Sequence, residues 1–244
     1  MIILNAGVPR SGTVLVNAIV RAVLSRERVP LAQANPHGKE LPALIRRLKR
    51  QGFDQLKHIL IHTHNWDGET SRLLAGAANV TGFANFRDPR DVCVSLMKLH
   101  DLDFEDMLEA TDRYFAAFAE MLDVLDLMVV PYELLVSDKR AMIFQIARRL
   151  GVWLPLDQID AIDDETSLDR HRSVMEKVRA REVDEVVERR NRSRILVEDK
   201  RTLINDRHIQ SGAQGRWRTE LDDAQREVLC TRLKPILEQY GYSD

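Results

Sequence analysis

The sequence predicts an α/β domain in which a central, mainly parallel sheet is flanked by helices on both faces. An apolar run starts at Ile2, and three more occupy residues 58–62, 80–86 and 127–131. Their continuous apolar character is typical of strands buried on both faces, and helical patterns separate each run from the next. Right-handed crossovers would bring the carboxyl ends of these strands to one edge of the sheet, where ligands bind in such folds.

Size and composition narrow the class of protein. A chain of 244 residues suffices for one domain with a substantial core, so we expect residues 1–244 to form a single domain. Lysine and arginine number 36 against 38 acidic residues, a balance that gives no sign of a nucleic-acid partner. The two cysteines, Cys93 and Cys230, do not suggest a disulfide framework or a thiolate metal site. No apolar run approaches the length of a membrane span and no targeting segment is recognisable, so we expect a cytoplasmic protein.

Helical spacing recurs along the chain. Apolar residues between Val14 and Val23 fall on one face of a helix that follows the first strand. A stretch rich in breakers, residues 33–38, precedes an amphipathic run at 41–48. We expect further helices at about 90–99, 103–125, 134–150 and 222–240, with Gly151 placed to end the third of them.

One segment within the domain, Ser167 to Arg201, is densely charged. A charge run of this kind is typical of a solvated surface, so we expect one exposed helix followed by a mobile loop. The functional alternative is that residues 167–201 form a lid over a substrate.

The turn after the first strand has the glycine spacing of a Walker A loop, with Gly7 and Gly12 bracketing four residues. Thr13 stands where that loop carries its lysine, and Val14 stands where it carries the hydroxyl that holds Mg²⁺. The cation is inside the loop instead, as Arg10. We therefore expect a metal-free anion, bound by backbone N–H groups at the start of a helix. A purely structural turn is the alternative.

A second polar motif follows the third apolar run of the chain. Asp88 is placed to cap a helix whose first residue is Pro89, which leaves Arg87 at the edge of the sheet and Ser95 two turns along the helix. Arg87 and Ser95 could together bind a second phosphate. The alternative is that Arg87 and Arg90 merely pair with the neighbouring aspartates at the surface, which contributes little to stability.

Taken together, five short motifs resemble those of the sulfotransferases that use 3′-phosphoadenosine 5′-phosphosulfate (PAPS), and they occur in the order of that family. They are Pro9-Arg10-Ser11-Gly12-Thr13, His62-Thr63-His64, Arg87-Asp88-Pro89-Arg90-Asp91-Val92 with Ser95, Pro131-Tyr132-Glu133, and Gly212-Ala213-Gln214-Gly215-Arg216-Trp217-Arg218. The resemblance covers most of the chain. It implies a P-loop-like three-layer α/β fold and transfer of the sulfuryl group to a hydroxyl or amine acceptor, with 3′-phosphoadenosine 5′-phosphate (PAP) as product and no metal.

The resemblance also implies roles for individual residues. His64 matches the catalytic base of the family, and Arg10 matches a lysine that stabilises charge on the departing oxygen. The residues expected to bind the donor are Pro9, Arg10, Ser11, Gly12, Thr13, Val14, Arg87, Ser95, Tyr132, Gly212 and Trp217. We expect the side chains of His62 and His64 to point to opposite sides of an extended segment, which argues against a shared metal.

Several positions depart from the family pattern. Leu15 replaces a common tryptophan, His62 replaces a lysine, and Gln210-Ser211 replaces an Arg-Lys pair, for which Arg216 or His208 could compensate. Two other functions remain open: a P-loop kinase or nucleotide hydrolase, and a catalytically silent nucleotide-binding module. The acceptor could be a small molecule, a glycan or a lipid, and no motif indicates the oligomeric state.

Overall fold

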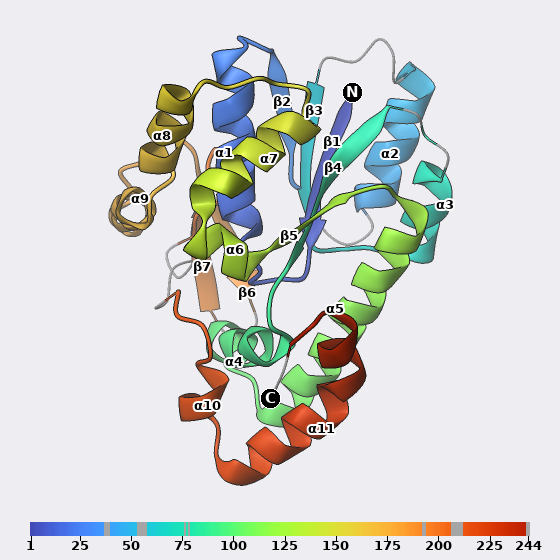
Figure 1. The fold of residues 1–244 in the computed structure, drawn as a ribbon, viewed down its shortest axis with the longest axis vertical. Helices are drawn as coiled ribbons and strands as arrows, with labels where there is room; N and C mark the ends of the chain where they lie inside the picture. The colour runs from blue at the N-terminus through green and yellow to red at the C-terminus, as the bar shows by residue number, and fades with distance from the viewer. Residues whose placement is uncertain are drawn as a thin grey trace.

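A five-stranded parallel sheet forms the centre of the protein. The computed structural model describes residues 1–36, 40–52, 58–75, 77, 79–191, 194–205 and 212–242, and Figure 1 shows its fold. The strands are β1 (Ile2–Gly7), β2 (Leu31–Ala34), β3 (His58–Thr63), β4 (Val80–Phe86) and β5 (Met128–Pro131). They pair in parallel in the order β2-β3-β1-β4-β5. The predicted α/β fold with a central parallel sheet flanked by helices is confirmed.

Helices cover both faces of this sheet (Figure 1). On one side lie α1 (Thr13–Arg26), α7 (Lys139–Arg149) and α8 (Leu156–Glu165); on the other lie α2 (Glu40–Gln51), α3 (Gly68–Leu74) and α5 (Phe104–Val124). Ile2 and Leu4 belong to the core on the second side, whereas Ile3 between them belongs to the core on the first. Successive side chains of β1 point to opposite faces of the sheet, and both faces are covered by helices, which explains the unbroken apolar sequence of this strand.

The carboxyl ends of the strands meet at one edge, as predicted. Pairing places Ala6 opposite Thr63, Gly7 opposite Asn85 and Phe86 opposite Pro131. Beyond this edge lie α4 (Pro89–His100), α10 (Trp217–Glu220) and α11 (Asp223–Gln239), below the strands in Figure 1. The loops that follow β1, β3, β4 and β5 therefore converge on one region.

The expected helices are confirmed at α4, α5 and α11, each of which begins after an aspartate cap. The Asp88, Asp103 and Asp222 side chains each accept a hydrogen bond from a backbone N–H of the first turn. Asp222 also forms a capping box with Gln225. Short polar side chains at these positions made the helix starts visible in the sequence.

One predicted helix was wrong in detail, and one strand was not predicted. The expected helix at 134–150 is divided into α6 (Tyr132–Ser137) and α7, because Asp138 caps a new helix by accepting from the Ala141 N–H at 3.1 Å. Gly151 does follow α7 in a left-handed conformation, with φ of 73°. Strand β2 was not predicted: its last two residues, Gln33 and Ala34, are the first two of the breaker-rich stretch and pair with β3. Residues 37–39 of that stretch lie outside the described residues.

The segment 167–201 is more ordered than its charge suggested. The exposed helix is present as α9 (Leu168–Ala180), but an antiparallel hairpin of β6 (Val186–Asn191) and β7 (Arg194–Asp199) replaces the expected loop. Val187, Ile195 and Val197 are β-branched and favour a strand, a preference that the charged residues between them obscured. The lid function stays a prediction.

No helix within the described ranges is both long enough and apolar enough to cross a bilayer.

Gly82 is expected to be essential to the sheet. A Cβ atom at this position of β4 would overlap the carbonyl oxygen of Leu4 on β1. Gly82→Ala should therefore lower the free energy of unfolding by at least about 2 kcal/mol. For a chain of this size that corresponds to a fall of about 4 to 8 °C in Tm.

Thermal and urea unfolding followed by circular dichroism measures this effect. Gly68→Ala is the matched control, because a Cβ atom there would have its nearest neighbours at 3.6 Å. It should change stability by less than about 0.5 kcal/mol. Equal stability of the two variants would contradict the close approach of β1 and β4.

Candidate active site

The loop between β1 and α1 is folded tightly against neighbouring strands. Gly7 has φ of 153°, and a Cβ atom there would overlap the Asn85 carbonyl oxygen. Arg10 and Gly12 are left-handed, with φ of 69° and 86°. Ser11 is fully buried and its hydroxyl donates to the Val8 carbonyl at 2.5 Å. These contacts fix the path of the chain from β1 into α1.

Two buried asparagines, which the sequence analysis did not single out, hold this loop from below. Asn5 on β1 donates from Nδ2 to the Thr13 carbonyl at 2.8 Å. Asn85 on β4 donates from Nδ2 to Asn5 Oδ1 at 2.6 Å and to the Ala6 carbonyl at 2.8 Å. Polar residues within otherwise apolar strands were the available signal for this role, because a buried amide needs partners.

The start of α1 is suited to bind an anion. Gly12 caps the helix without a side-chain hydrogen bond, and no acidic residue lies in the first turn. The N–H groups of that turn have no partner within the helix, and the helix dipole adds positive potential at the same end. Pro9, Gly12, Thr13 and Val14 line the adjacent cavity. The loop can therefore accept a phosphate in the way predicted.

The cavity has a volume of about 1260 Å³ and lies at the carboxyl ends of the strands. It brings together ten of the predicted site residues, namely Pro9, Arg10, Gly12, Thr13, Val14, His64, Arg87, Ser95, Tyr132 and Gly212. Ser11 is buried beneath the loop and Trp217 is packed behind the cavity wall, so neither lines it.

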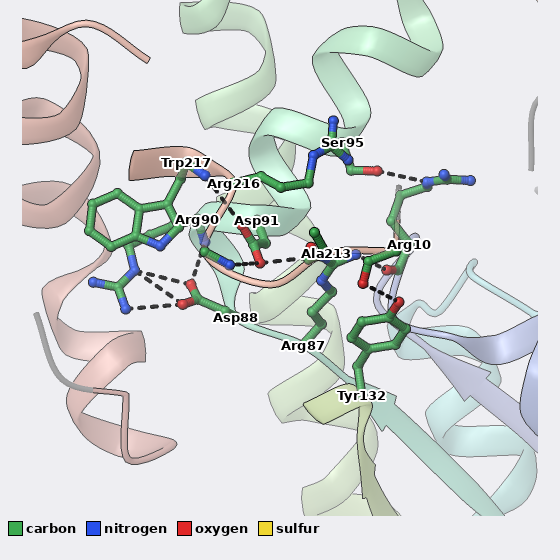
Figure 2. A network of polar contacts seen from close by, with 12 residues as sticks. Arg10, Arg87, Asp88, Arg90, Asp91, Ser95, Tyr132, Ala213, Arg216 and Trp217 are labelled. Carbon is green, nitrogen blue, oxygen red and sulfur yellow. Dashed lines mark hydrogen bonds and ion pairs between the residues drawn. The ribbon is translucent and has the colours of Figure 1, made fainter. Parts of the chain in front are cut away.

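Arginine side chains supply positive charge to this cavity. Arg10 donates from Nε to the Ser95 hydroxyl at 2.9 Å, the contact that Figure 2 shows between α4 and the β1–α1 loop. Burial, together with repulsion from Arg87 and Arg216, lowers the pKa of Arg10 to about 10, although Tyr132 acts in the opposite direction. Arg10 remains cationic at neutral pH. A bound anion would relieve the repulsion among these guanidinium groups.

Arg87 is held on several sides but keeps one donor to offer. Its guanidinium lies 4.3 Å from the centre of the Tyr132 ring, and Nη2 donates to the Ala213 carbonyl at 2.8 Å. Nη2 also pairs with Asp91 at 3.2 Å. The Nε atom is buried and has no hydrogen-bond partner among the described residues. A buried donor of this kind fits a ligand that carries a second anionic group.

Both ion pairs named in the alternative are present, but they are buried and do not lie at the surface. Arg87 pairs with Asp91, and Arg90 pairs with Asp88 at 3.0 Å. The side chains of Arg87 and Asp91 are 5% and 1% exposed. The alternative placed these pairs at the surface, whereas the segment 212–217 lies against this end of α4: Gly215 and Trp217 donate to Asp91, and the Trp217 ring lies against Arg90.

Asp91 anchors that segment, a role that sequence reasoning missed. Its carboxylate accepts from the backbone N–H of Gly215 at 2.8 Å and of Trp217 at 3.3 Å. The guanidinium groups of Arg90 and Arg218 each lie 4.2 Å from the centre of the Trp217 ring. Figure 2 shows the contact of Trp217 with Arg90. Trp217 therefore fastens the segment to α4 and does not face the cavity.

The other predicted residues of this region are placed as follows. Gly212 accepts from the Tyr132 hydroxyl at 3.0 Å through its carbonyl. Arg216 lines the cavity and pairs with Glu220 through Nε at 2.8 Å. His208, Gln210 and Ser211 lie outside the described residues, so the compensating role of His208 stays a prediction.

His64 follows β3 and faces the start of α1. Its Nδ1 atom lies 3.0 Å from the Gly7 carbonyl oxygen. Because a carbonyl can only accept, Nδ1 must carry the hydrogen, which makes Nε2 the basic atom of the neutral ring. Nε2 lies 3.4 Å from the Thr13 hydroxyl oxygen. A basic nitrogen thus lies beside the predicted anion site.

The expectation that His62 and His64 point to opposite sides was wrong. Their ring centres are 5.1 Å apart in an edge-to-face contact, because residues two apart on an extended chain share a face. His62 contacts Asn35 through Nδ1 at 3.1 Å. Among the described residues, no group of three or more histidine, cysteine, aspartate or glutamate side chains could hold a metal ion.

Comparisons with known proteins identify the family. The description of the matching family is "sulfotransferase domain", and the match covers residues 2–241. No curated protein matches the sequence. Among solved structures, retinol dehydratase in complex with androsterone and the inactive cofactor PAP has a TM-score of 0.62 at 19% identity, covering 97% of this chain and 80% of the other.

Two further structures are similar. Retinol dehydratase with retinol and PAP gives a TM-score of 0.61 at 16% identity, covering 97% of this chain and 81% of the other. A mouse sulfotransferase complexed with PAP gives 0.61 at 14% identity, covering 98% and 87%. At these identities the structures establish the common fold. Together with the family match over nearly the whole chain, they lead to the conclusion that this protein belongs to the sulfotransferase domain family.

Proposed function

We propose that this protein transfers the sulfuryl group of PAPS to a hydroxyl or amine acceptor, with His64 as the base. The observation that carries the proposal is the position of His64 Nε2, which lies 3.4 Å from the Thr13 hydroxyl at the start of α1. A base and an anion site are thereby placed side by side in a chain of the sulfotransferase family. Both groups are required when a proton is removed from the acceptor as a phosphate departs.

The two ends of the cavity fit the two phosphate groups of the donor. The backbone N–H groups from Ser11 to Thr13 and the guanidinium of Arg10 would hold the 5′ end. Arg87, with its buried Nε, and Ser95 would hold the 3′-phosphate. When bound, PAPS supplies the electrophilic sulfur and the leaving phosphate. The 2.9 Å contact between Arg10 and Ser95 joins the two ends, so they are pre-arranged for one ligand.

His64 and Arg10 have distinct roles. The Gly7 carbonyl orients the imidazole and stabilises the cation that forms when Nε2 takes a proton from the acceptor. Arg10 stabilises negative charge on the departing oxygen through a planar guanidinium that can bind two oxygens. Its pKa of about 10 keeps it charged at neutral pH, so its contribution is electrostatic.

The adenine is contacted differently from the pattern expected in the family. Leu15 lines the cavity, so it offers the adenine ring an aliphatic contact in place of an aromatic one. The Tyr132 ring is already covered by Arg87 on one face. Trp217 acts indirectly, because it holds segment 212–217 in place. The carbonyl groups of this segment accept from the side chains of the site: Ala213 accepts from Arg87, and Gly212 accepts from Tyr132.

The acceptor would bind beside His64, where Asn35, which contacts His62, and Asn65, the residue after His64, line the cavity. The related structures hold androsterone and retinol, which supports a small-molecule acceptor without identifying it. Leu196 and Glu198 of the hairpin also line the cavity, and we propose that segment 167–201 covers the bound acceptor.

A cytoplasmic location is supported by Cys93 and Cys230, which are both free thiols.

Donor selectivity is the first test. Isothermal titration calorimetry should show that PAP binds at least about tenfold more tightly than ATP, because Arg87 and Ser95 meet a 3′-phosphate that ATP lacks. Binding of PAP should not depend on Mg²⁺, because Val14 offers no hydroxyl to a metal. Tighter binding of Mg²⁺-ATP than of PAP would favour a kinase or hydrolase and contradict the proposal.

His64→Gln should lower kcat by about 10²- to 10⁴-fold, the usual contribution of a general base. The affinity for PAP should stay within about twofold of the parent, since His64 acts on the acceptor. Transfer of labelled sulfate from PAPS to an acceptor found by screening measures the first effect, and calorimetry measures the second. His58→Gln, at the opposite end of β3, is the control that should retain activity.

Two outcomes of this test contradict the assignment. Retention of kcat by His64→Gln would exclude His64 as the base. Absence of transfer by the parent protein, in spite of tight PAP binding, would favour a catalytically silent module.

Substitutions of Arg10 test whether its positive charge contributes to transfer. Arg10→Gln should reduce kcat by about 10²- to 10³-fold, because a cation directed at the developing charge is lost. Arg10→Lys should stay within about tenfold of the parent, because a point charge is restored but the two-oxygen contact is not. Both variants keep a side chain at the same left-handed position, which equalises the backbone strain. Equal loss in both variants would show that charge at this position is not the determining property.

A further inference from the structure

Glu133 joins three distant parts of the chain behind the arginine that meets the 3′-phosphate. It is the second residue of α6, and its two carboxylate oxygens accept different hydrogen bonds. Oε1 accepts from the backbone N–H of Asp88 at 3.1 Å. Oε2 accepts from the Tyr242 hydroxyl at 2.8 Å. Asp88 follows β4, whereas Tyr242 follows α11.

Tyr242 also contacts the other side of the same turn. Its ring centre lies 5.3 Å from that of Phe86, the last residue of β4. Its backbone N–H donates to the Leu237 carbonyl at 2.8 Å, which fixes the chain after α11. Arg87 therefore lies between Phe86, which Tyr242 contacts directly, and Asp88, which it contacts through Glu133.

The side chain of Arg87 is held by the neighbour of Glu133. Tyr132 lies beneath the guanidinium at 4.3 Å, and its hydroxyl donates to the Gly212 carbonyl. The first two residues of α6 thus fix Arg87 in complementary ways: Tyr132 supports its guanidinium, and Glu133 fixes the backbone of the next residue. A displacement of Glu133 would move both supports.

We propose that Tyr242 is a positioning residue of the donor site: its hydroxyl fixes Glu133, Glu133 fixes the Asp88 N–H, and the turn so held directs Arg87 toward the 3′-phosphate. This inference rests on the proposed function, which assigns that phosphate to Arg87. Tyr242 itself touches neither donor nor acceptor. It acts by keeping a ligand-binding side chain in its productive geometry.

The Tyr242 phenol stays neutral, so it can donate to Glu133 at every pH used in an assay. Burial, the nearby carboxylate of Glu133 and their hydrogen bond raise the pKa of Tyr242 well above its ordinary value; Asp88 adds to this effect and Arg87 opposes it. The phenol therefore stays protonated and remains a donor to Glu133 at all pH values at which the enzyme would be assayed. A hydrogen bond to a charged acceptor is among the stronger ones in proteins.

Tyr242→Phe removes only the hydroxyl and keeps the contact with Phe86. We expect the Kd for PAP to rise about fivefold, the scale on which supporting hydrogen bonds affect a site. The Kd for 5′-AMP, which lacks the 3′-phosphate, should stay within about twofold of the parent. With PAPS, KM for the donor should rise while kcat stays within about twofold, because the reacting groups are unaffected.

Tyr240→Phe is the matched control. The Tyr240 ring also packs against Phe86, at 4.4 Å, but its hydroxyl is not bonded to Glu133. It should bind PAP and 5′-AMP like the parent. Glu133→Gln should keep much of the arrangement of Tyr242, residue 133 and Asp88, because the amide oxygen can accept from the Asp88 N–H and the amide N–H can donate to the phenol oxygen. Its loss of PAP affinity should therefore be smaller than that of Tyr242→Phe.

The outcomes separate this inference from the function on which it rests. An unchanged Kd for PAP in Tyr242→Phe, or an equal loss for PAP and 5′-AMP, would overturn the positioning role. Equal affinities of the parent protein for PAP and 5′-AMP would overturn the assignment of the 3′-phosphate to Arg87, and with it the role of Tyr242. A selective loss of PAP affinity in Tyr242→Phe, absent in Tyr240→Phe, supports the proposal.

Discussion

The buried ion pair between Arg87 and Asp91 is the interaction on which the rest of the site depends. Two charges removed from water are destabilising unless their remaining hydrogen-bonding capacity is met. Here Asp91 meets it through the backbone N–H groups of Gly215 and Trp217. Arg87 meets part of it through the Ala213 carbonyl, while its Nε atom has no partner among the described residues. The pair therefore cannot form without segment 212–217. The end of β4, the start of α4 and this segment are consequently one structural unit.

This unit is connected to the loop that follows β1. Arg87 approaches the Arg10 carbonyl oxygen at 3.5 Å, and Ser95 accepts from Arg10 Nε. The loop itself is fixed from below by Asn5 and Asn85. The mutually repelling guanidinium groups of Arg10, Arg87 and Arg216 are thereby held by neutral amides, a hydroxyl and the carboxylates of Asp91 and Glu220. An anionic ligand would relieve the repulsion among these groups.

The residue proposed as the base is positioned by a different kind of contact. The backbone carbonyl of Gly7 accepts from His64 Nδ1 and thereby selects the tautomer of the imidazole. That carbonyl belongs to Gly7, where the chain leaves β1 for the anion-binding loop. The same turn thus orients His64 and begins the loop proposed to hold the departing phosphate. Because both functions depend on one turn, their separation is set by the parallel pairing of β1 with β3.

Local sequence determined the kinds of element and much of their order. Glycine spacing at 7 and 12, the aspartate caps, and the polar residues after each apolar run depend on a few neighbouring positions, so they were legible without a structure. The hairpin at β6 and β7 was not, because charged side chains masked its strand pattern. Only the tertiary structure decided the tautomer of His64, the anchoring by Asp91 and the link from Tyr242 to Asp88. Those contacts join residues as far as 126 positions apart, and strand register and helix packing bring them together, which no local pattern encodes.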